Sequence, residues 1–477
     1  MKKAQLILVL ILFILFNAST YSQNNVCNCS NVYQELMQKV EENYIGLAQM
    51  NDAEKNQYNQ LKNEAGNSIS DIKPKDCTKF LQGFLSYFND EHLFVYERPT
   101  YTNQELDSFK QQQKSNRASV KSILATLQFE KNMVEKNGLD GIIGKWTDGE
   151  SELAIIKDEG YYKTFIINSK NKTVDVGELK AQFKASEKGF DGTYYSYAYA
   201  PRYVEGNIYK EQTLIVLTGG TYWGKVGSLS NREIAVINRD EVNLPVIKKL
   251  DNQNTLFSIP SFLADYNKFV KVIMDNIELL KNTTNLIIDV RGNVGGNAIY
   301  FSFIDAYATH SLKGSQGLIL ASKSTQEYFE RLARNSPEIY QPVVERIQGN
   351  MGKIIEGPKY PDKVFPPFES KIKNVAILTD NGSMSAAESF VLHSKGSSTR
   401  VKTFGSPTGG VIDYTSVNTL ELNSGSQNIY FGYPTSTYNK DISEKGFNKT
   451  GILPDIPIKN KVEDKIEFIM NYYKANH

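Results

Sequence analysis

The chain has 477 residues and a formal net charge of +1, and its basic residues form no clustered run. Neither nucleic acid nor an anionic membrane surface is therefore an expected partner, because both need a concentrated positive patch. The length exceeds what one hydrophobic core usually supports, so we expect a multidomain α+β fold. The sequence carries no metal-binding or nucleotide-binding motif, and no cofactor is expected.

The N-terminus has the pattern of a secretory signal peptide. A basic start (Met1-Lys2-Lys3) is followed by an apolar run at 6–16 and by small residues that permit cleavage before Gln23. The apolar run is shorter than the roughly 20 residues that span a bilayer. Residues 1–22 therefore predict export to the periplasm or the cell surface, with no membrane span in the mature chain.

Residues 23–137 predict a helical N-terminal region. A first helical stretch is marked by apolar residues at helical spacing, namely Val32, Leu36, Val40 and Tyr44. A second amphipathic, charged stretch covers 107–135. The region also contains all three cysteines. In an oxidising compartment we expect one disulfide, which joins Cys77 to either Cys27 or Cys29.

Residues 138–250 predict a β-rich middle domain. Apolar and polar side chains alternate at 179–185, while residues 161–167 and 213–217 are rich in strand-forming types. A small barrel or a sandwich fits this pattern.

Residues 251–477 predict an α/β core. An amphipathic helix at 266–280 leads into an apolar strand at 286–290, and a similar strand covers 375–379. Residues 324–348 are predicted to be mostly helical, either as a cap over a site or as a surface helical hairpin.

A glycine- or serine-bearing turn follows each of these two strands. In the first, Gly295 and Gly296 allow backbone N–H groups to face a ligand without an intervening side chain. In the second, Ser385 would open a helix, so that the Ala386 N–H lies at the positive end of the helix dipole. A serine in this position suits acyl transfer, although Ser385 or Ser383 could instead be a simple helix N-cap.

Four short motifs then occur in a defined order: Arg-Gly-Asn-Val-Gly-Gly at 291–296, Ser-Ala-Ala-Glu at 385–388, Thr-Phe-Gly at 403–405 and Gly-Ile-Leu-Pro-Asp at 451–455. This series resembles the C-terminal-processing, or tail-specific, serine peptidases and their tricorn-like relatives. The resemblance covers roughly the last two-fifths of the chain. It implies an α/β catalytic core in 251–477, Ser385 as nucleophile, and an oxyanion hole from Gly295, Gly296 and Ala386.

The serine needs a base that accepts its proton. Processing peptidases use a lysine shortly after the Thr-Phe-Gly turn, whereas tricorn-like members use a histidine from far upstream. Residues 406–414 contain no lysine, and Asp90-Glu91-His92 resembles the upstream segment, so His92 is the predicted general base. The other histidines are predicted to be structural within an apolar helical stretch (His310), too distant along the helix (His393) or terminal (His477).

The pattern leaves three candidates for the third catalytic residue. Relatives tend to have an acidic residue just before the terminal motif, where this chain has Asn448. Asn448 could orient the imidazole through its side-chain carbonyl, with Glu444 and Asp441 as acidic alternatives if the loop folds back. Arg291 is assigned to an ion pair or to loop bracing, outside catalysis.

Together these patterns predict an exported serine peptidase that cleaves peptide bonds through an acyl-enzyme on Ser385, with His92 as general base. A peptide or protein substrate is expected to bind in extended form beside a sheet edge. Two alternatives stay open: a catalytically inactive peptidase-like binding protein of the cell envelope, and an esterase. The distance from His92 to Ser385 bears on the first alternative, and matched peptide and ester substrates bear on the second.

Overall fold

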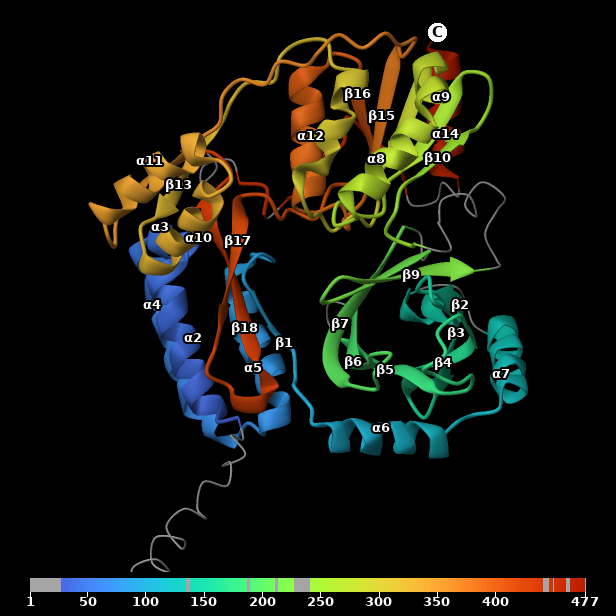
Figure 1. Ribbon diagram of the computed structural model, residues 1–477, viewed down its shortest axis with the longest axis vertical. Helices are drawn as coiled ribbons and strands as arrows, with labels where there is room; N and C mark the ends of the chain where they lie inside the picture. Colours follow the sequence, from blue (N-terminus) through green and yellow to red (C-terminus); the bar gives the residue numbers. More distant parts are fainter. Residues whose placement is uncertain are drawn as a thin grey trace, which may run out of the picture.

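The computed structural model describes residues 27–133, 138–186, 189–210, 213–226, 241–440, 446–448, 450–459 and 464–476. The predicted signal peptide at 1–22 lies outside these residues, as do Asp441, Glu444 and His477. Within them the chain forms a helical N-terminal region, a closed barrel and two further sheets (Figure 1). The predicted helical N-terminal region and β-rich domain are thereby confirmed.

The N-terminal region is built from helices with one buried face. They are α2 (Cys29–Asn43), α3 (Ile45–Gln49), α4 (Asp52–Ser68) and α5 (Cys77–Leu85), with short 3-10 turns at Ile69–Asp71, Pro74–Asp76 and Ser86–Phe88. The predicted apolar positions Val32, Leu36 and Val40 are buried in α2, and Tyr44, the residue that ends this helix, is buried as well. Their core also includes Phe431 and Tyr433 from near the C-terminus, so the two ends of the chain fold together.

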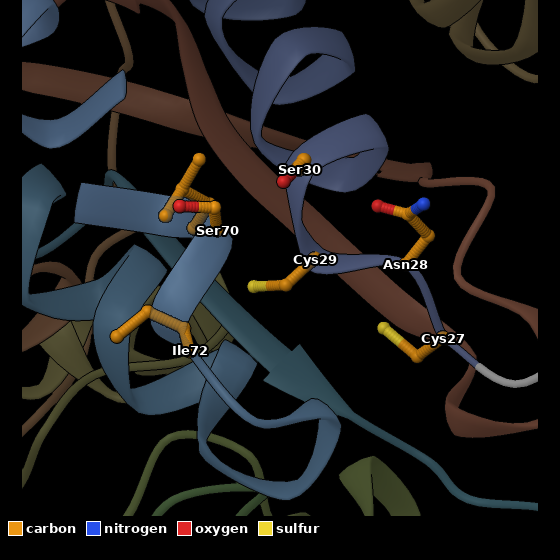
Figure 2. A pocket seen from close by; sticks show the side chains of 7 residues that line it. Cys27, Asn28, Cys29, Ser30, Ser70 and Ile72 are labelled. Carbon is orange, nitrogen blue, oxygen red and sulfur yellow. The ribbon is translucent and has the colours of Figure 1, made fainter. Parts of the chain in front are cut away.

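A pocket of about 370 Å³ lies where α2 begins (Figure 2). Its lining consists of Cys27, Asn28, Cys29, Ser30, Ile69, Ser70 and Ile72. The lining has no charged side chain, and the pocket lies apart from the two turns that the sequence singles out. It therefore supplies no part of the predicted site.

The β-rich domain is a closed eight-stranded barrel. In order around the barrel the strands are β2 (Gly144–Thr147), β3 (Ser151–Asp158), β4 (Tyr161–Ser169), β5 (Leu179–Ser186), β6 (Gly189–Tyr195), β7 (Pro201–Tyr209), β8 (Leu214–Leu217) and β9 (Thr221–Val226). Consecutive strands pair antiparallel, and β2 closes the barrel against β9. Both tryptophans of the chain, Trp146 and Trp223, are fully buried inside it. The barrel alternative of the prediction is therefore the correct one.

Two helices connect the N-terminal region to the barrel. They are α6 (Asn103–Ser115) and α7 (Val120–Met133), followed by a 3-10 turn at Gly138–Ile142. Ile123 and Leu127 of α7 pack into the hydrophobic core of the barrel. The second amphipathic stretch of the sequence thus covers the barrel wall.

A six-stranded sheet follows, in the order β10 (Val246–Lys249), β11 (Asn254–Ser258), β12 (Asn285–Asp289), β15 (Asn374–Thr379), β16 (Val401–Gly405) and β19 (Ile456–Pro457). All neighbours except β10 and β11 pair in parallel. Because β12 and β15 are adjacent and parallel, the turns that follow them meet at one sheet edge, the usual position for a site in such a sheet.

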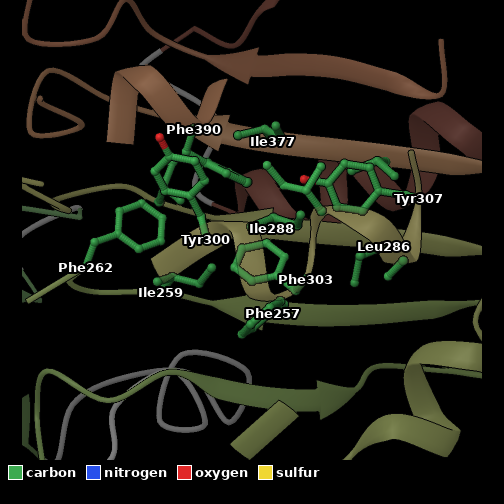
Figure 3. Close-up of a cluster of buried hydrophobic side chains, with 14 of the residues drawn as sticks. Phe257, Ile259, Phe262, Leu286, Ile288, Tyr300, Phe303, Tyr307, Ile377 and Phe390 are labelled. Atoms are coloured by element: carbon green, nitrogen blue, oxygen red, sulfur yellow. The ribbon is translucent and has the colours of Figure 1, made fainter. Parts of the chain in front are cut away.

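Helices pack against this sheet and complete its cores. They are α8 (Tyr266–Asp275), α9 (Ile277–Asn282), α12 (Ala386–Ser397) and α14 (Lys465–Ala475), with 3-10 turns at Ala298–Ser302 and Ile304–Ala306. The sequence predicts one helix at 266–280, but the helix breaks at Asn276, whose backbone N–H closes onto Ile273 and Met274. Aromatic side chains from these elements, Phe262, Tyr300, Phe303 and Phe390, fill one core against Ile288 and Ile377 (Figure 3).

A third sheet combines β1 (Phe94–Glu97), β18 (Ile429–Thr437), β13 (Gln316–Leu320) and β14 (Ile354–Lys359), with β17 (Tyr414–Glu421) paired to β18 and a 3-10 turn at Gly425–Gln427. The helices α10 (Lys323–Ala333) and α11 (Pro337–Gln348) form a hairpin that shares a core with Ile319 and Ile355 of this sheet. The helical character predicted for 324–348 is thus confirmed. Since β1 pairs with β18, the sheet brings the segment before β1 close to residues 414–437.

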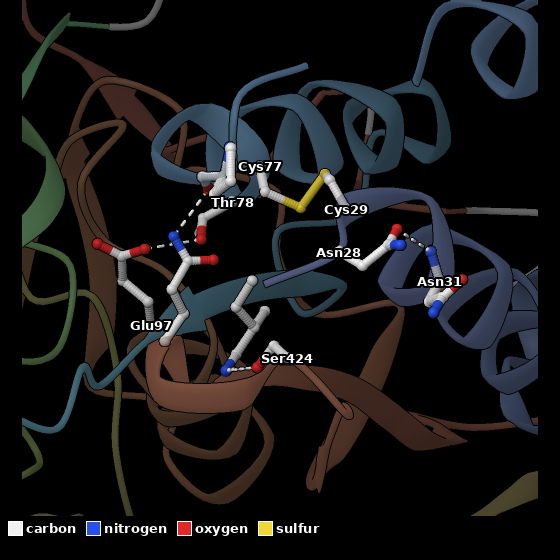
Figure 4. Close-up of a disulfide and its surroundings, with 10 residues drawn as sticks. Asn28, Cys29, Asn31, Cys77, Thr78, Glu97 and Ser424 are labelled. Carbon is white, nitrogen blue, oxygen red and sulfur yellow. Dashed lines mark hydrogen bonds between the residues drawn. A yellow bond between two sulfur atoms is a disulfide. The ribbon is translucent and has the colours of Figure 1, made fainter. Parts of the chain in front are cut away.

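The disulfide joins Cys29 to Cys77, so of the two predicted pairings the one through Cys29 is present (Figure 4). Cys27 is a free, buried thiol. The bond links the start of α2 to the start of α5, the helix that precedes His92. The disulfide therefore links two helices of the N-terminal region, α2 and α5, covalently.

Candidate active site

Ser385 lies in a strained turn between β15 and α12. It occupies the N-cap of α12 with φ +53° and ψ −115°, a conformation that a residue with a Cβ rarely adopts. Its backbone N–H donates to the Glu388 carboxylate at 3.0 Å. Such strain is maintained only where the surroundings impose it, and it is concentrated at functional sites.

His92 reaches this serine from the far end of the chain. Its Nε2 atom lies 2.8 Å from Ser385 Oγ, although 293 positions separate the two residues. Asn89, at φ +48°, ends the 3-10 turn after α5, and the Asp90 carboxylate then accepts the His92 backbone N–H at 2.9 Å. The structure thus brings together the two residues that the sequence singles out as nucleophile and base.

The other ring nitrogen fixes the tautomer. His92 Nδ1 lies 2.7 Å from the backbone carbonyl oxygen of Tyr414. A carbonyl oxygen only accepts hydrogen bonds, so Nδ1 carries the proton and Nε2 presents its lone pair to the Ser385 hydroxyl. This is the tautomer that a general base requires.

The protonation state of the imidazole also suits a base. Burial lowers the pKa of His92 to about 4, because the charged imidazolium is poorly solvated there. Burial raises the pKa of the neighbouring Asp90 carboxyl to about 7. Near neutral pH His92 is therefore uncharged and able to accept a proton.

The Asn448 side chain hydrogen-bonds to the segment just before Tyr414, whose carbonyl oxygen contacts His92. Its side-chain oxygen accepts the backbone N–H groups of Ile412 and Asp413, at 3.3 and 3.1 Å. The Asp413 carboxylate in turn accepts the N–H groups of Phe447 and Asn448, at 2.6 and 3.0 Å. This reciprocal contact holds the segment that ends at Tyr414, so the structure places Asn448 where it supports the acceptor of His92.

Glu388 is a buried carboxylate that ties the start of α12 to the following loop. Besides the Ser385 N–H it accepts hydrogen bonds from Thr408 Oγ1 and from the backbone N–H groups of Gly410 and Val411. Burial raises the pKa of this carboxyl, while the hydrogen bonds to Thr408 and the backbone favour its charged form. The fourth residue of the Ser-Ala-Ala-Glu motif thus braces the turn that carries Ser385.

The three predicted oxyanion residues differ in their surroundings. The Gly295 N–H donates to Asn293 Oδ1 at 3.0 Å, and Gly295 is buried directly against Ser385. Gly296 is exposed, and neither its N–H nor that of Ala386 has a hydrogen-bond acceptor among the described residues. The Cβ position of Gly296 lies against Phe262 and Leu263, whereas that of Gly295 lies against Ser385 and the Ala386 nitrogen.

Arg291 has the structural role that the sequence suggests. Its guanidinium makes a bidentate contact with the Asp289 carboxylate, with both nitrogen to oxygen distances at 2.9 Å. Asp289 is fully buried and also lies 3.2 Å from Lys210 Nζ. Arg291 and Lys210 thus both contact this buried carboxylate at the end of β12.

The remaining histidines lie elsewhere. His393 is placed between the hydroxyls of Tyr300 and Tyr438, at 3.1 Å from each. His310 contacts Thr309 in an exposed segment after the 3-10 turns, and not in the helical stretch expected from the sequence. In the part of the chain that the structure describes, no group of three or more His, Cys, Asp or Glu side chains could hold a metal ion.

Sequence reasoning missed the carbonyl of Tyr414, the contact between Asp413 and Asn448, and the burial of Lys210 beside Asp289. The backbone acceptor has no sequence signal, since every residue carries a carbonyl. Asp413 did have a sequence signal, because it is a carboxylate only eight residues after the Thr-Phe-Gly motif.

The family model described as peptidase family S41 matches residues 255–458. This region belongs to peptidase family S41. The resemblance to C-terminal-processing, tricorn-like peptidases is thereby confirmed, and the chain is a serine-type peptidase. The matched region contains Ser385 and both turns, whereas His92 and the barrel lie before it.

Several solved structures are similar over most of the chain at low identity. Mature CPAF is 12% identical, with 90% of this chain and 92% of that chain covered and a TM-score of 0.45. The photosystem II D1 C-terminal processing protease is 11% identical, with 92% and 95% covered and a TM-score of 0.37. The tricorn protease is 13% identical, with 94% and 37% covered and a TM-score of 0.42.

A comparison with curated protein sequences finds no match. Across the described residues, none of the helices has the length and apolar character needed to cross a membrane.

Proposed function

We propose that this S41 member is an exported peptidase in which His92 deprotonates Ser385 and Ser385 attacks a peptide carbonyl. The observation that carries the proposal is the 2.8 Å separation of His92 Nε2 and Ser385 Oγ, with the tautomer fixed by Tyr414. A serine hydroxyl is a weak nucleophile until a neighbouring base accepts its proton. The pair meets this requirement before any substrate is bound.

The catalytic cycle follows from the donors around the serine. As Ser385 Oγ bonds to the carbonyl carbon, its proton passes to His92 Nε2, and the backbone N–H groups of Gly296 and Ala386 stabilise the oxyanion. His92 then protonates the leaving amine, which departs from the acyl-enzyme. Water, deprotonated by His92, releases the acyl group and restores Ser385. Gly295 contributes close packing in this scheme, because its own N–H already binds Asn293.

The orienting acceptor in this proposal is a carbonyl, not a carboxylate. A neutral acceptor gives the imidazolium less stabilisation than an ionised one. Asn448 acts by holding the segment that presents this carbonyl.

The substrate is proposed to be a peptide or protein chain bound in extended form. Extended peptides pair their backbone with an exposed strand edge. β17 begins at Tyr414, next to His92, and among the described strands it pairs with β18 alone. Its other edge offers a place for such pairing.

Export is proposed from residues 1–22. The disulfide between Cys29 and Cys77 is compatible with an oxidising compartment, in which such bonds persist. The destination is the periplasm or the cell surface.

The contact between His92 and Ser385 counts against a catalytically inactive binding protein, since a noncatalytic scaffold does not need a correctly protonated base on its serine. An esterase would use the same residues. Matched peptide and ester substrates with the same acyl group separate the two activities through their kcat/KM values.

Labelling of the purified protein with a fluorophosphonate probe tests the proposal. Wild type is expected to label, and Ser385→Ala and His92→Ala are expected to lose labelling while they retain their thermal unfolding transitions. Ser108→Ala and His310→Ala, at exposed positions outside the site, are the matched controls. Absence of wild-type labelling, or labelling that survives in Ser385→Ala, would contradict the proposal.

A further inference from the structure

One residue of the barrel, Tyr209, touches both catalytic turns. Tyr209, at the end of β7, is buried, and its side chain lies against the backbone of Gly292 and Gly382. A Cβ atom at Gly292 would lie 2.7 Å from a Tyr209 side-chain carbon, and one at Gly382 would lie 2.3 Å from another. At Gly382 the Tyr209 ring occupies the space that a side chain would need, and at Gly292 the Tyr209 Cβ and the Leu214 Cδ2 occupy it, so the barrel excludes a side chain at both positions.

The next residue inserts a charge into the end of the sheet. Lys210 has φ +53° and a side chain that is only 6% exposed. Its Nζ atom lies 2.6 Å from Ser258 Oγ, at the end of β11, and 3.2 Å from Asp289 Oδ2, at the end of β12. The side chain of a barrel lysine thus contacts the ends of two strands of the six-stranded sheet.

Asp380 connects the barrel to the same two turns. Its Oδ1 atom accepts the backbone N–H groups of Gly292 and Gly382, both at 2.9 Å. Its Oδ2 atom accepts the backbone N–H of Lys210 at 3.3 Å. One carboxylate therefore fixes the turn that leads to Gly296, the turn that leads to Ser385, and the barrel, relative to one another.

We propose that Tyr209 and Lys210 of the barrel are positioning residues for the reaction. They fix the position of the turn at 291–296, which carries Gly296, relative to the turn at 380–385, which carries Ser385. The inference rests on the proposed function, because it concerns the same serine and the same backbone donors. It gives the barrel a role beyond that of a spacer. Neither residue is a catalytic residue, since each acts through Gly292, Asp380 or Asp289.

This role predicts a specific kinetic signature. A displacement of about 1 Å by a change away from the chemistry can lower a rate about 100-fold. Loss of register between the two turns would weaken oxyanion stabilisation, which acts in the transition state, more than it weakens binding of the ground-state peptide. The expected change is in kcat and in the rate of probe labelling, with KM little altered.

Four variants test the proposal in the full-length mature protein. Lys210→Met removes the charge and keeps much of the volume, while Tyr209→Ala removes the ring. Tyr209→Phe keeps the ring and removes only the hydroxyl. Lys163→Met is the control, because Lys163 pairs with Asp158 on the barrel surface, away from both turns.

Tryptophan fluorescence provides an internal report on folding. The only two tryptophans lie inside the barrel, so their emission follows the folding of the barrel alone. A fluorophosphonate labelling rate reports on Ser385 without a peptide-binding step. Together the two signals separate a displaced catalytic turn from an unfolded barrel.

Lys210→Met and Tyr209→Ala are expected to lower kcat and the labelling rate about 10- to 100-fold, with KM within about twofold and native tryptophan emission. Tyr209→Phe and Lys163→Met are expected to resemble wild type. Unchanged labelling in both Lys210→Met and Tyr209→Ala would overturn the proposal, and so would a loss that occurs only together with unfolded emission. If wild type itself is not labelled at Ser385, the proposed function fails. If wild type is labelled and Lys210→Met and Tyr209→Ala are labelled at the same rate, only the role of the barrel is refuted.

Discussion

The Nδ1 atom of His92 lies 2.7 Å from the backbone carbonyl oxygen of Tyr414, and this contact orients the imidazole toward Ser385. A backbone acceptor cannot be removed by a side-chain substitution at its own position. Its placement depends on the residues that hold the segment from 412 to 414, and above all on Asn448 and Asp413.

Asn448→Ala is accordingly expected to lower kcat about 10-fold, because it leaves two backbone N–H groups without their acceptor and loosens the segment before Tyr414. His92→Ala should lower kcat far more, by about 10,000-fold, since it removes the base itself. Asn171→Ala is the matched control, as Asn171 also accepts a backbone N–H, that of Thr173, but lies in the loop between β4 and β5 of the barrel. Steady-state kinetics with a fluorogenic peptide distinguish these cases. A loss in Asn448→Ala as large as that in His92→Ala would place Asn448 in direct contact with the base.

The labelling rate of Ser385 is expected to fall on the acid side of its pH profile only near pH 4. Burial lowers the pKa of His92 to about 4, so the neutral base persists well below the usual histidine pKa of about 6.5. The pH dependence of the fluorophosphonate labelling rate in the free enzyme measures this value. Ser108→Ala should give the same profile as wild type. An acid limb at pH 6 to 7 would show that the imidazole is more solvated than its surroundings indicate.

Asp90→Asn is expected to change how stability depends on pH. Burial raises the pKa of Asp90 to about 7, so its contribution to folding is full below the ordinary carboxyl pKa and is lost as pH rises toward 7. His92, whose pKa is lowered to about 4, contributes above its ordinary pKa and loses this contribution as pH falls toward 4. The two slopes oppose each other in the wild type.

In Asp90→Asn only the histidine slope remains, so Tm should rise more steeply between pH 4 and 6.5 than in the wild type. The asparagine side-chain oxygen can still accept the His92 N–H, which keeps the local turn. Thermal unfolding at constant ionic strength measures the effect, with Asp107→Asn at an exposed position of α6 as control. Parallel curves for Asp90→Asn and wild type would contradict the expected pKa of Asp90.

The elements with strong periodicity could be predicted from the sequence, and the contacts between them could not. The strands β12 and β15 and the start of α12 lie within a residue or two of the predicted positions, because continuous apolar runs and a serine before a helix are local signals. The barrel strands were recognisable by alternation, but barrel closure between β2 and β9 is a nonlocal fact.

The residues of the candidate site also fall into those that the sequence could predict and those that it could not. His92 and Ser385 are recognisable as residue types within motifs, whereas the roles of Tyr414, Asp380 and Lys210 arise from tertiary packing. The break at Asn276 shows the limit for helices as well, since the apolar pattern of 266–280 continues across it and only the cap geometry ends α8.

Removal of the disulfide is expected to destabilise the region that carries His92. The bond between Cys29 and Cys77 spans 48 positions, and a closed loop of that length constrains the unfolded chain by about 4 kcal/mol. The double variant Cys29→Ser, Cys77→Ser should therefore lower the free energy of unfolding measured in urea, while Cys27→Ser, which leaves the bond intact, serves as control. Equal stability of the two variants would argue that the bond does not restrict the unfolded chain.

The close packing of Gly295 gives the most local test of the site. A Cβ atom there would lie 2.8 Å from Ser385 Cβ and 3.0 Å from the Ala386 nitrogen, so Gly295→Ala must displace the nucleophile or the turn that faces it. The labelling rate is expected to fall by about 100-fold. Gly160→Ala is the matched control, because Gly160 also has a positive φ, +79°, but a Cβ there meets nothing within 4 Å. It should cost about 1 kcal/mol of stability through backbone strain and leave labelling intact. If the two variants label equally fast, the contact between Gly295 and Ser385 does not govern the geometry of the nucleophile.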